Sequence, residues 1–181
     1  RLCDALRLKT QLAAPTGRAA KRLSEVTGRE ASTIHRLLEA QFDEQTGRMA
    51  FFHDEDAPLA CDAMIVDETS MVDLQLMASL LKALKPGCRL LLVGDPDQLP
   101  PVGAGNVFSD LIRSGVVQTV RLTEIFRQAQ QSLIVMNAHA VNQGELPVLT
   151  ATDRDFFFLR RRDPAAAVKT IQELCQTRLP K

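Results

Sequence analysis

Short apolar runs alternate with helix-like segments along most of this chain, and that alternation limits the folds available to it. The apolar runs at 9–14, 63–66, 89–93 and 116–122 have the length and composition of strands. Apolar residues at helical spacing predict helices up to Val26 after the first run, and then at 31–40, 73–84, 106–113 and 132–142. Such alternation predicts an α/β fold with a parallel sheet and helices on both of its faces.

Composition narrows the function classes further. The chain has 181 residues, of which 45% are hydrophobic and 24% charged, as in ordinary globular domains. Its 22 basic and 22 acidic residues leave no net charge, so a nucleic-acid surface would have to be a local patch. No apolar run approaches the roughly 20 residues that span a membrane, and the four cysteines form no Cys-x-x-Cys pair. We therefore expect reduced thiols, a cytoplasmic location and no membrane partner.

Two adjacent carboxylates, Asp67 and Glu68, follow the apolar run at 63–66. The carboxyl ends of parallel strands are where open α/β sheets bind their ligands. Neighbours on an extended chain point in opposite directions, so one acid can hold a metal ion while the other faces a water molecule, which suits phosphoryl transfer. Taken alone, however, the pair is better explained as a strand end whose acids cap the next turn.

Polar loops follow two further strands. The loop at 94–105 contains three Gly, three Pro and two Asp, which excludes regular structure, and Gln98 lies within it. Arg127 and Gln128 follow the fourth apolar run. Since parallel strands end along one edge of a sheet, these two loops and the carboxylate pair are predicted to converge on a single ligand.

The turn after the first strand offers a second candidate site. Backbone N–H groups at the start of the following helix, together with Thr16, Arg18 and Lys21, could hold a phosphate group. A capped helix with solvated basic residues explains the same pattern equally well. The next helix is expected to have Ser32 or Thr33 as its N-cap.

Residues 41–56 change character and predict a β-hairpin with Thr46 and Gly47 in its turn. A two-stranded hairpin is only marginally stable alone, so this one is expected to be either packed against the body or functional. Phe51 or Phe52 could stack on a nucleic-acid base. Packing of these rings against the body is the better explanation.

The same loops, taken in order, resemble the motor core of the RecD-like DNA helicases, the 5′-to-3′ branch of superfamily 1. Ala-Pro-Thr-Gly-Arg-Ala-Ala at 14–20 is similar to helicase motif Ia, and Ser-Thr-Ile-His-Arg-Leu-Leu at 32–38 to motif Ib. Val-Asp-Glu-Thr-Ser-Met at 66–71 is similar to motif II, the Walker B element, while 94–105 and 122–128 are similar to motifs III and IV. The resemblance covers roughly residues 9–147 and implies a RecA-like P-loop NTPase fold. The hairpin sits where this family carries its duplex-splitting pin.

The resemblance also implies an enzyme that uses ATP and Mg²⁺. Asp67 would hold Mg²⁺, and Glu68 would orient or deprotonate the attacking water. Gln98 would sense the γ-phosphate, and Arg127 would contact it and stabilise the charge developing on it. The residues implied along the single-stranded DNA path are Pro15, Thr16, Arg18, Thr33, His35, Pro100, Pro101 and Val102. A duplex junction and RecB- or RecC-like subunits are further partners that the family implies, in DNA recombination and repair.

One motif of the family is missing from these residues. A P-loop reads Gly-x-x-x-x-Gly-Lys-Ser/Thr, and no such sequence occurs here. Because the family's P-loop precedes motif Ia by about one helix, we expect the chain to begin just after it. We then expect a truncated first RecA-like domain at 1–147 that includes the hairpin, and the start of a second at 148–181. Within the second, a strand at 155–159 and a helix at 164–179 with Pro at its first position are predicted.

Two functions of different classes remain open on the sequence alone. The first is an ATP-dependent DNA helicase, of which this chain would be the middle of the motor and inactive by itself. The second is a nucleotide-independent DNA-binding or adaptor module of the same fold. A Gly-Lys-Thr loop within about 30 residues upstream would favour the first.

Overall fold

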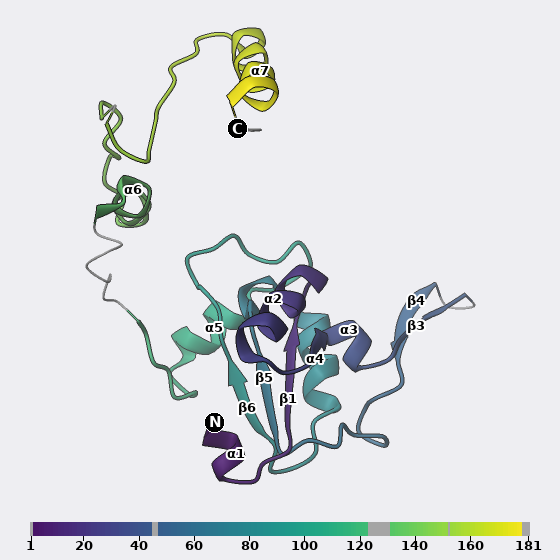
Figure 1. Cartoon of the computed structure of the whole chain (residues 1–181). Helices are drawn as coiled ribbons and strands as arrows, with labels where there is room; N and C mark the ends of the chain where they lie inside the picture. The colour runs from purple at the N-terminus through teal and green to yellow at the C-terminus, as the bar shows by residue number, and fades with distance from the viewer. Residues whose placement is uncertain (1, 45–46, 123–130, 152, 179–181) are drawn as a thin grey trace. The chain divides into compact units, whose positions relative to one another are not determined.

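The computed structural model describes residues 2–44, 47–122, 131–151 and 153–178 (Figure 1). The chain divides into two compact units, 1–120 and 121–181. The first unit contains the sheet and nearly all of the buried apolar residues. Within the described ranges, no helix is both long enough and apolar enough to cross a membrane.

A parallel four-stranded sheet forms the centre of the first unit. Its strands, in spatial order, are β2 (Ala31–Thr33), β1 (Thr10–Ala14), β5 (Ala63–Val66) and β6 (Arg89–Leu92). The register pairs Ala14 with Thr33, Ala13 with Val66, and Val66 with Leu92. All four strands therefore end along one edge, which confirms the predicted parallel arrangement and places the loops that follow them together.

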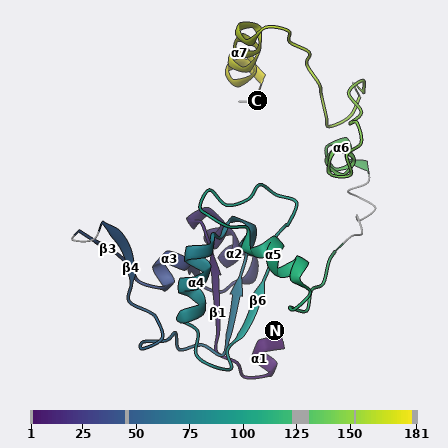
Figure 2. The same cartoon turned by 180° about the vertical axis from the view of Figure 1, so that it is seen from behind.

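Helices cover both faces of this sheet, as predicted. Helix α2 (Gly17–Thr27) lies on one face, while α3 (Ile34–Leu37) and α4 (Leu74–Lys82) lie on the other (Figures 1 and 2). Two further helices, α1 (Leu2–Ala5) and α5 (Val107–Ser114), complete the unit. Gly28 ends α2 in the left-handed conformation that a helix C-cap favours, with a φ of 67°.

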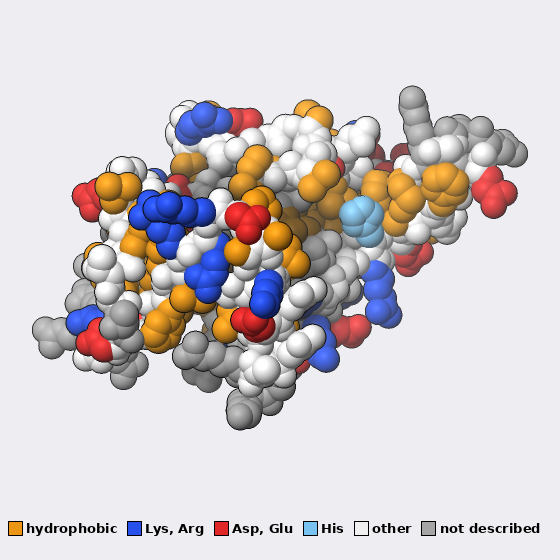
Figure 3. Space-filling model, turned by 90° about the horizontal axis from the view of Figure 1, so that it is seen from above, with side chains coloured by type: hydrophobic (Ala, Val, Ile, Leu, Met, Phe, Trp, Pro, Cys, Tyr) orange, Lys and Arg blue, Asp and Glu red, His pale blue; other side chains and the backbone are white. Residues whose placement is uncertain are grey.

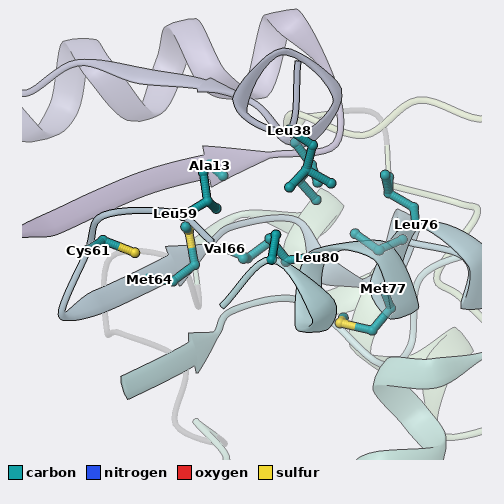
Figure 4. Close-up of a cluster of buried hydrophobic side chains, with 12 residues drawn as sticks. Ala13, Leu38, Leu59, Cys61, Met64, Val66, Leu76, Met77 and Leu80 are labelled. Carbon is teal, nitrogen blue, oxygen red and sulfur yellow. The ribbon is translucent and has the colours of Figure 1, made fainter. Parts of the chain in front are cut away.

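The core fills the space between the sheet and the α3–α4 face (Figure 4). Alternate strand residues point toward it, and the helices meet them with their apolar stripes. The largest fully buried side chains include Ile34, Leu38, Met64, Val66 and Leu80. Burial of side chains of this size contributes about 1.5–3 kcal/mol each, so this face dominates the stability of the unit.

The predicted hairpin is confirmed by its strand pairing over 40–51, whereas Thr46 of its predicted turn lies outside the described residues. Strands β3 (Ala40–Asp43) and β4 (Arg48–Phe51) pair antiparallel, with Phe42 opposite Met49. Both of those side chains are exposed, and hydrophobic atoms line the visible side of the hairpin where it extends from the body (Figure 3). Phe51 at the base packs against the core, as the packing explanation predicted, whereas Phe52 is exposed.

Three secondary-structure predictions were wrong. Residues 31–33 begin no helix, because they pair with β1 as a short strand, and the helix starts only after Thr33. Residues 116–122 and 155–159 form no strand. A strand requires a partner for its backbone groups, and no strand of the described chain pairs with either segment, so apolar composition alone was insufficient.

The second unit is described by two helices, α6 (Leu133–Asn142) and α7 (Pro164–Glu173), and a π-helical turn at Leu174–Arg178. Proline occupies the predicted first position of α7. The amide group of Asn137 donates to the carbonyl oxygen of Val148 at 3.0 Å and accepts from its N–H at 2.8 Å. This pair of hydrogen bonds holds the segment after α6 against that helix.

Candidate functional site

The carboxylate loop begins where β5 ends. The N–H of Asp67 still donates to the carbonyl oxygen of Ala13 at 2.9 Å, which continues the sheet by one residue. Glu68 then adopts the left-handed region, with a φ of 52° and a ψ of 39°, and the 3₁₀ helix η1 (Thr69–Met71) follows. A non-glycine residue in that region is strained, and such strain concentrates at functional sites.

The two acids do not act as simple helix caps. The side chain of Glu68 makes no cap hydrogen bond to η1. Asp67 accepts only the N–H of Glu68, at 3.0 Å on Oδ1, within the described residues. Both side chains are half-buried, so they have oxygen atoms available to a ligand at the sheet edge.

The loop at 94–105 is fastened to the carboxylate loop at its start. The N–H of Thr69 donates to the carbonyl oxygen of Val93 at 2.9 Å, and the hydroxyl of Ser70 donates to Oε1 of Gln98 at 3.5 Å. A Cβ atom at Gly94 would lie 3.1 Å from the backbone nitrogens of Thr69 and Ser70. The loops after β5 and β6 are therefore brought together, as the strand-end argument predicted.

The same loop is fastened again at its far end. The N–H of Leu74 donates to the carbonyl oxygen of Ala104 at 2.9 Å. A Cβ atom at Gly103 would lie 2.1 Å from Oδ2 of Asp73, so only glycine permits this approach. Between the two attachments, Leu99 and Val102 are fully exposed.

Sequence reasoning identified Asp73 only as an N-cap and missed its contact with Gly103. The cap is present, because the carboxylate accepts the N–H of Leu76 at 2.8 Å. The repeated glycines at 103 and 105 were the available signal, since two glycines so close together often mark a close backbone approach.

The turns after β1 and β2 form the other half of the edge. The hydroxyl of Thr16 caps α2 by accepting the N–H of Ala19 at 3.2 Å, and that of Thr33 caps α3 by accepting the N–H of Arg36 at 3.2 Å. Because Ala14 pairs with Thr33, these two turns lie side by side. Each hydroxyl can still donate its own hydrogen to an acceptor.

The remaining predicted residues fall in three groups. Arg18 and His35 are exposed beside the two capped turns, and the ring of His35 lies 6.0 Å from that of Phe51. Pro15 and Pro101 are half-buried, while Pro100 and Val102 are exposed on the fastened loop. Arg127 belongs to the segment 123–130, which lies outside the described residues.

The donor chemistry at this edge fits a magnesium–nucleotide ligand. No group of three or more His, Cys, Asp or Glu side chains arranged to hold a metal ion occurs among the described residues. Mg²⁺ commonly binds proteins through one or two carboxylates and takes its other ligands from water and substrate phosphates. Asp67 and Glu68, two half-buried carboxylates at a strand end, match that pattern.

A protein-family model described as an AAA domain matches residues 2–158 of the chain. The chain belongs to this family. An ATP-dependent RecD2 DNA helicase of Deinococcus radiodurans is 48% identical over 146 residues, which cover 81% of this chain and 19% of that protein. A RecBCD enzyme subunit RecD of Mycobacterium tuberculosis is 36% identical over 187 aligned residues, covering 91% of this chain and 32% of that protein.

These relatives confirm the resemblance to RecD-like helicases. The chain spans about a fifth to a third of the length of the two relatives. A solved structure of Bacteroides Pif1 bound to single-stranded DNA aligns with 95% of this chain and 48% of that one, at a TM-score of 0.51 and 19% identity. The structural likeness shows the fold, a P-loop NTPase α/β sheet that is present here in part.

Proposed function

We propose that this chain is part of the motor of an ATP-dependent DNA helicase, in which ATP hydrolysis drives movement along single-stranded DNA and separation of the duplex. One observation carries the proposal. The loop after β6 is hydrogen-bonded to the carboxylate loop after β5, at the same edge where the turns after β1 and β2 lie. A ligand-induced shift in the carboxylate loop would therefore reach the loop after β6.

The nucleotide half would use four residues. Asp67 would hold Mg²⁺, which when bound offsets the negative charge of the phosphates. Glu68 would orient the attacking water and accept its proton, and its left-handed backbone turns it away from the strand direction. Gln98 would contact the γ-phosphate while tied to Ser70, and Arg127 would stabilise the charge that develops there.

The DNA half would use the capped turns and the exposed part of the fastened loop. Hydroxyl groups and backbone N–H groups suit the sugar–phosphate backbone, and an exposed arginine adds a charge contact. The residues proposed to line the path are Pro15, Thr16, Arg18, Thr33, His35, Pro100, Pro101 and Val102. The hairpin would meet the duplex junction.

Domain boundaries, partners and location are also proposals. We propose that residues 1–147 belong to a first RecA-like domain and 148–181 to a second, whereas the compact units divide at 120 and 121. Relatives named as RecBCD enzyme subunits support RecB- or RecC-like partners. A role in DNA recombination or repair and a cytoplasmic location are proposed with them.

Hydrolysis by the longer protein is the decisive measurement. Glu68→Gln should retain ATP binding and lose at least about 10³-fold in DNA-stimulated hydrolysis, because the group that activates water is removed. Glu30→Gln, an exposed acid in the turn before β2, is the matched control and should hydrolyse normally. Normal unwinding by Glu68→Gln would overturn the assignment.

The 181-residue chain by itself should not hydrolyse ATP, because it contains no Gly-x-x-x-x-Gly-Lys-Ser/Thr sequence. DNA-stimulated hydrolysis by this chain that is lost in Glu68→Gln would contradict that expectation. The adaptor alternative makes a different prediction: the longer protein would bind DNA equally with and without ATP and would hydrolyse none.

A further inference from the structure

Two thiols meet at the amino end of the sheet, opposite the edge that carries the carboxylates. The sulfur atoms of Cys61 and Cys88 are 3.8 Å apart. Cys61 lies two residues before β5, and Cys88 lies immediately before β6. Because Ala63 pairs with Arg89 in the sheet, the two thiols are held beside each other by the strand register.

The two thiols differ in exposure. Cys61 is completely buried, and burial raises the pKa of its thiol to about 12. Cys88 is only half-buried, so a small oxidant can reach it from solvent. This difference in exposure makes Cys88 the thiol that a peroxide reaches first.

We propose that Cys61 and Cys88 form an oxidisable dithiol that closes to an intramolecular disulfide when a peroxide oxidises Cys88. The peroxide removes two electrons from the Cys88 sulfur, which becomes a sulfenic acid as one water is released. The Cys61 sulfur then attacks the Cys88 sulfur, and the S–S bond forms as the S–O bond breaks. The Cys61 proton and the departing hydroxyl leave as a second water.

The geometry requires only a small movement. A disulfide needs the sulfur atoms about 2.05 Å apart, so the pair must close by less than 2 Å through side-chain rotation. The bond would join residues 27 positions apart and tie together the starts of two neighbouring strands. The dithiol lies outside the proposed nucleotide and DNA site, and it stands independently of the helicase proposal.

The test uses the full 181-residue chain with Cys3 and Cys175 both replaced by serine, so that only the two thiols remain. Hydrogen peroxide should convert this variant to a monomer that has lost two hydrogens and both free thiols. Peptide mapping without reductant should give one linked peptide containing both residues. Its Tm should rise by several degrees over the reduced form, since the crosslink constrains the unfolded chain.

Two single replacements in the same background provide the controls. Cys61→Ala should accumulate a sulfenic acid at Cys88 that a sulfenic-specific reagent traps, and Cys88→Ser should show no oxidation under the same peroxide treatment. Circular dichroism confirms that each variant is folded. Failure of the folded two-thiol variant to yield the linked peptide would overturn the proposal, as would equal oxidation of Cys61 in Cys88→Ser.

Discussion

Helices α4 and α7 begin with the same kind of local signal, yet they end up in different surroundings. Asp73 caps α4 and Asp163 caps α7, each by accepting backbone N–H groups of the first turn. Helix α4 buries three apolar side chains, whereas no residue of α7 is buried. The first helix packs in the unit that contains the sheet, and the second belongs to the unit 121–181.

The difference separates two sources of helix formation. Capping and spacing are local properties, so they act in both units. Burial depends on an apolar surface that faces the helix, and within the first unit the sheet supplies that surface to α4. Most of the stability of a short helix comes from such packing rather than from propensity. The two units should therefore respond very differently to loss of an apolar side chain.

The largest contrast is expected for Leu80→Ala in α4 against Ile171→Ala in α7. Leu80 is fully buried against the core, and its truncation should cost about 2–5 kcal/mol of unfolding free energy through lost transfer energy and a cavity. Ile171 is 59% exposed, so its truncation should change stability by less than about 0.5 kcal/mol. Urea unfolding followed by circular dichroism measures both, since the chain has no Trp or Tyr.

Leu80→Met is the control, because it changes the side chain at the same buried position while keeping its volume similar. It should cost under about 1.5 kcal/mol, because a side chain of similar size refills the space. Equal losses for Leu80→Ala and Ile171→Ala would mean that α7 also packs against an apolar surface in solution, and the contrast between the units would disappear.

The same distinction explains which parts of the fold the sequence could predict. The strands at β1, β5 and β6, the cap at Asp73 and the stop at Gly28 all follow from residues close together in the chain. The predictions for residues 31–33 and 116–122 were wrong for a non-local reason. Whether such a segment becomes a strand depends on a partner strand, which the segment itself does not encode.

The candidate site likewise contains residues that the sequence predicted and a contact that it missed. Asp67, Glu68 and Gln98 were found because polar residues after parallel strands share an edge, and the structure places their loops together. The contact between Asp73 and Gly103 was missed, since the glycines at 103 and 105 indicate a close approach but do not identify the helix cap that makes it. The Glu68→Gln replacement tests the roles proposed for these side chains.

An intermediate effect is expected for Asn137→Ala in the second unit. Asn137 is one of the few buried residues there, and its amide makes both hydrogen bonds to Val148. Their loss should cost about 1–2 kcal/mol locally and speed hydrogen exchange at the Val148 amide roughly tenfold. Exchange of the core amides of the first unit should be unaffected. The control Gln172→Ala, on the exposed surface of α7, should change neither the stability nor the exchange of the Val148 amide. Faster exchange at Met64 or Val66 in Asn137→Ala would show that the two units unfold together.

The smallest effect on stability is expected from replacing a carboxylate, and the two units each offer one for comparison. A hydrogen bond from Lys85, and another from the backbone N–H of Lys9, hold the pKa of Asp62 below its ordinary value. Hydrogen bonds from Ser132 and from the N–H of Leu133 lower the pKa of Asp155 in the same direction. A depressed pKa stabilises the folded state above the unfolded value of about 3.9, and that contribution is lost as the pH falls through the folded pKa.

Asp62→Asn should therefore lower the urea midpoint of the first unit slightly at pH 7, with a difference from the unsubstituted chain that shrinks below about pH 4. The effect is small because both partners of the ion pair are 40% exposed and water screens their attraction. Asp155→Asn should leave that midpoint unchanged at both pH values and alter only the fraying of α6, seen as faster exchange of its first amides. A pH-dependent shift of the same midpoint by Asp155→Asn would mean that the ends of α6 contribute to the stability of the sheet-containing unit.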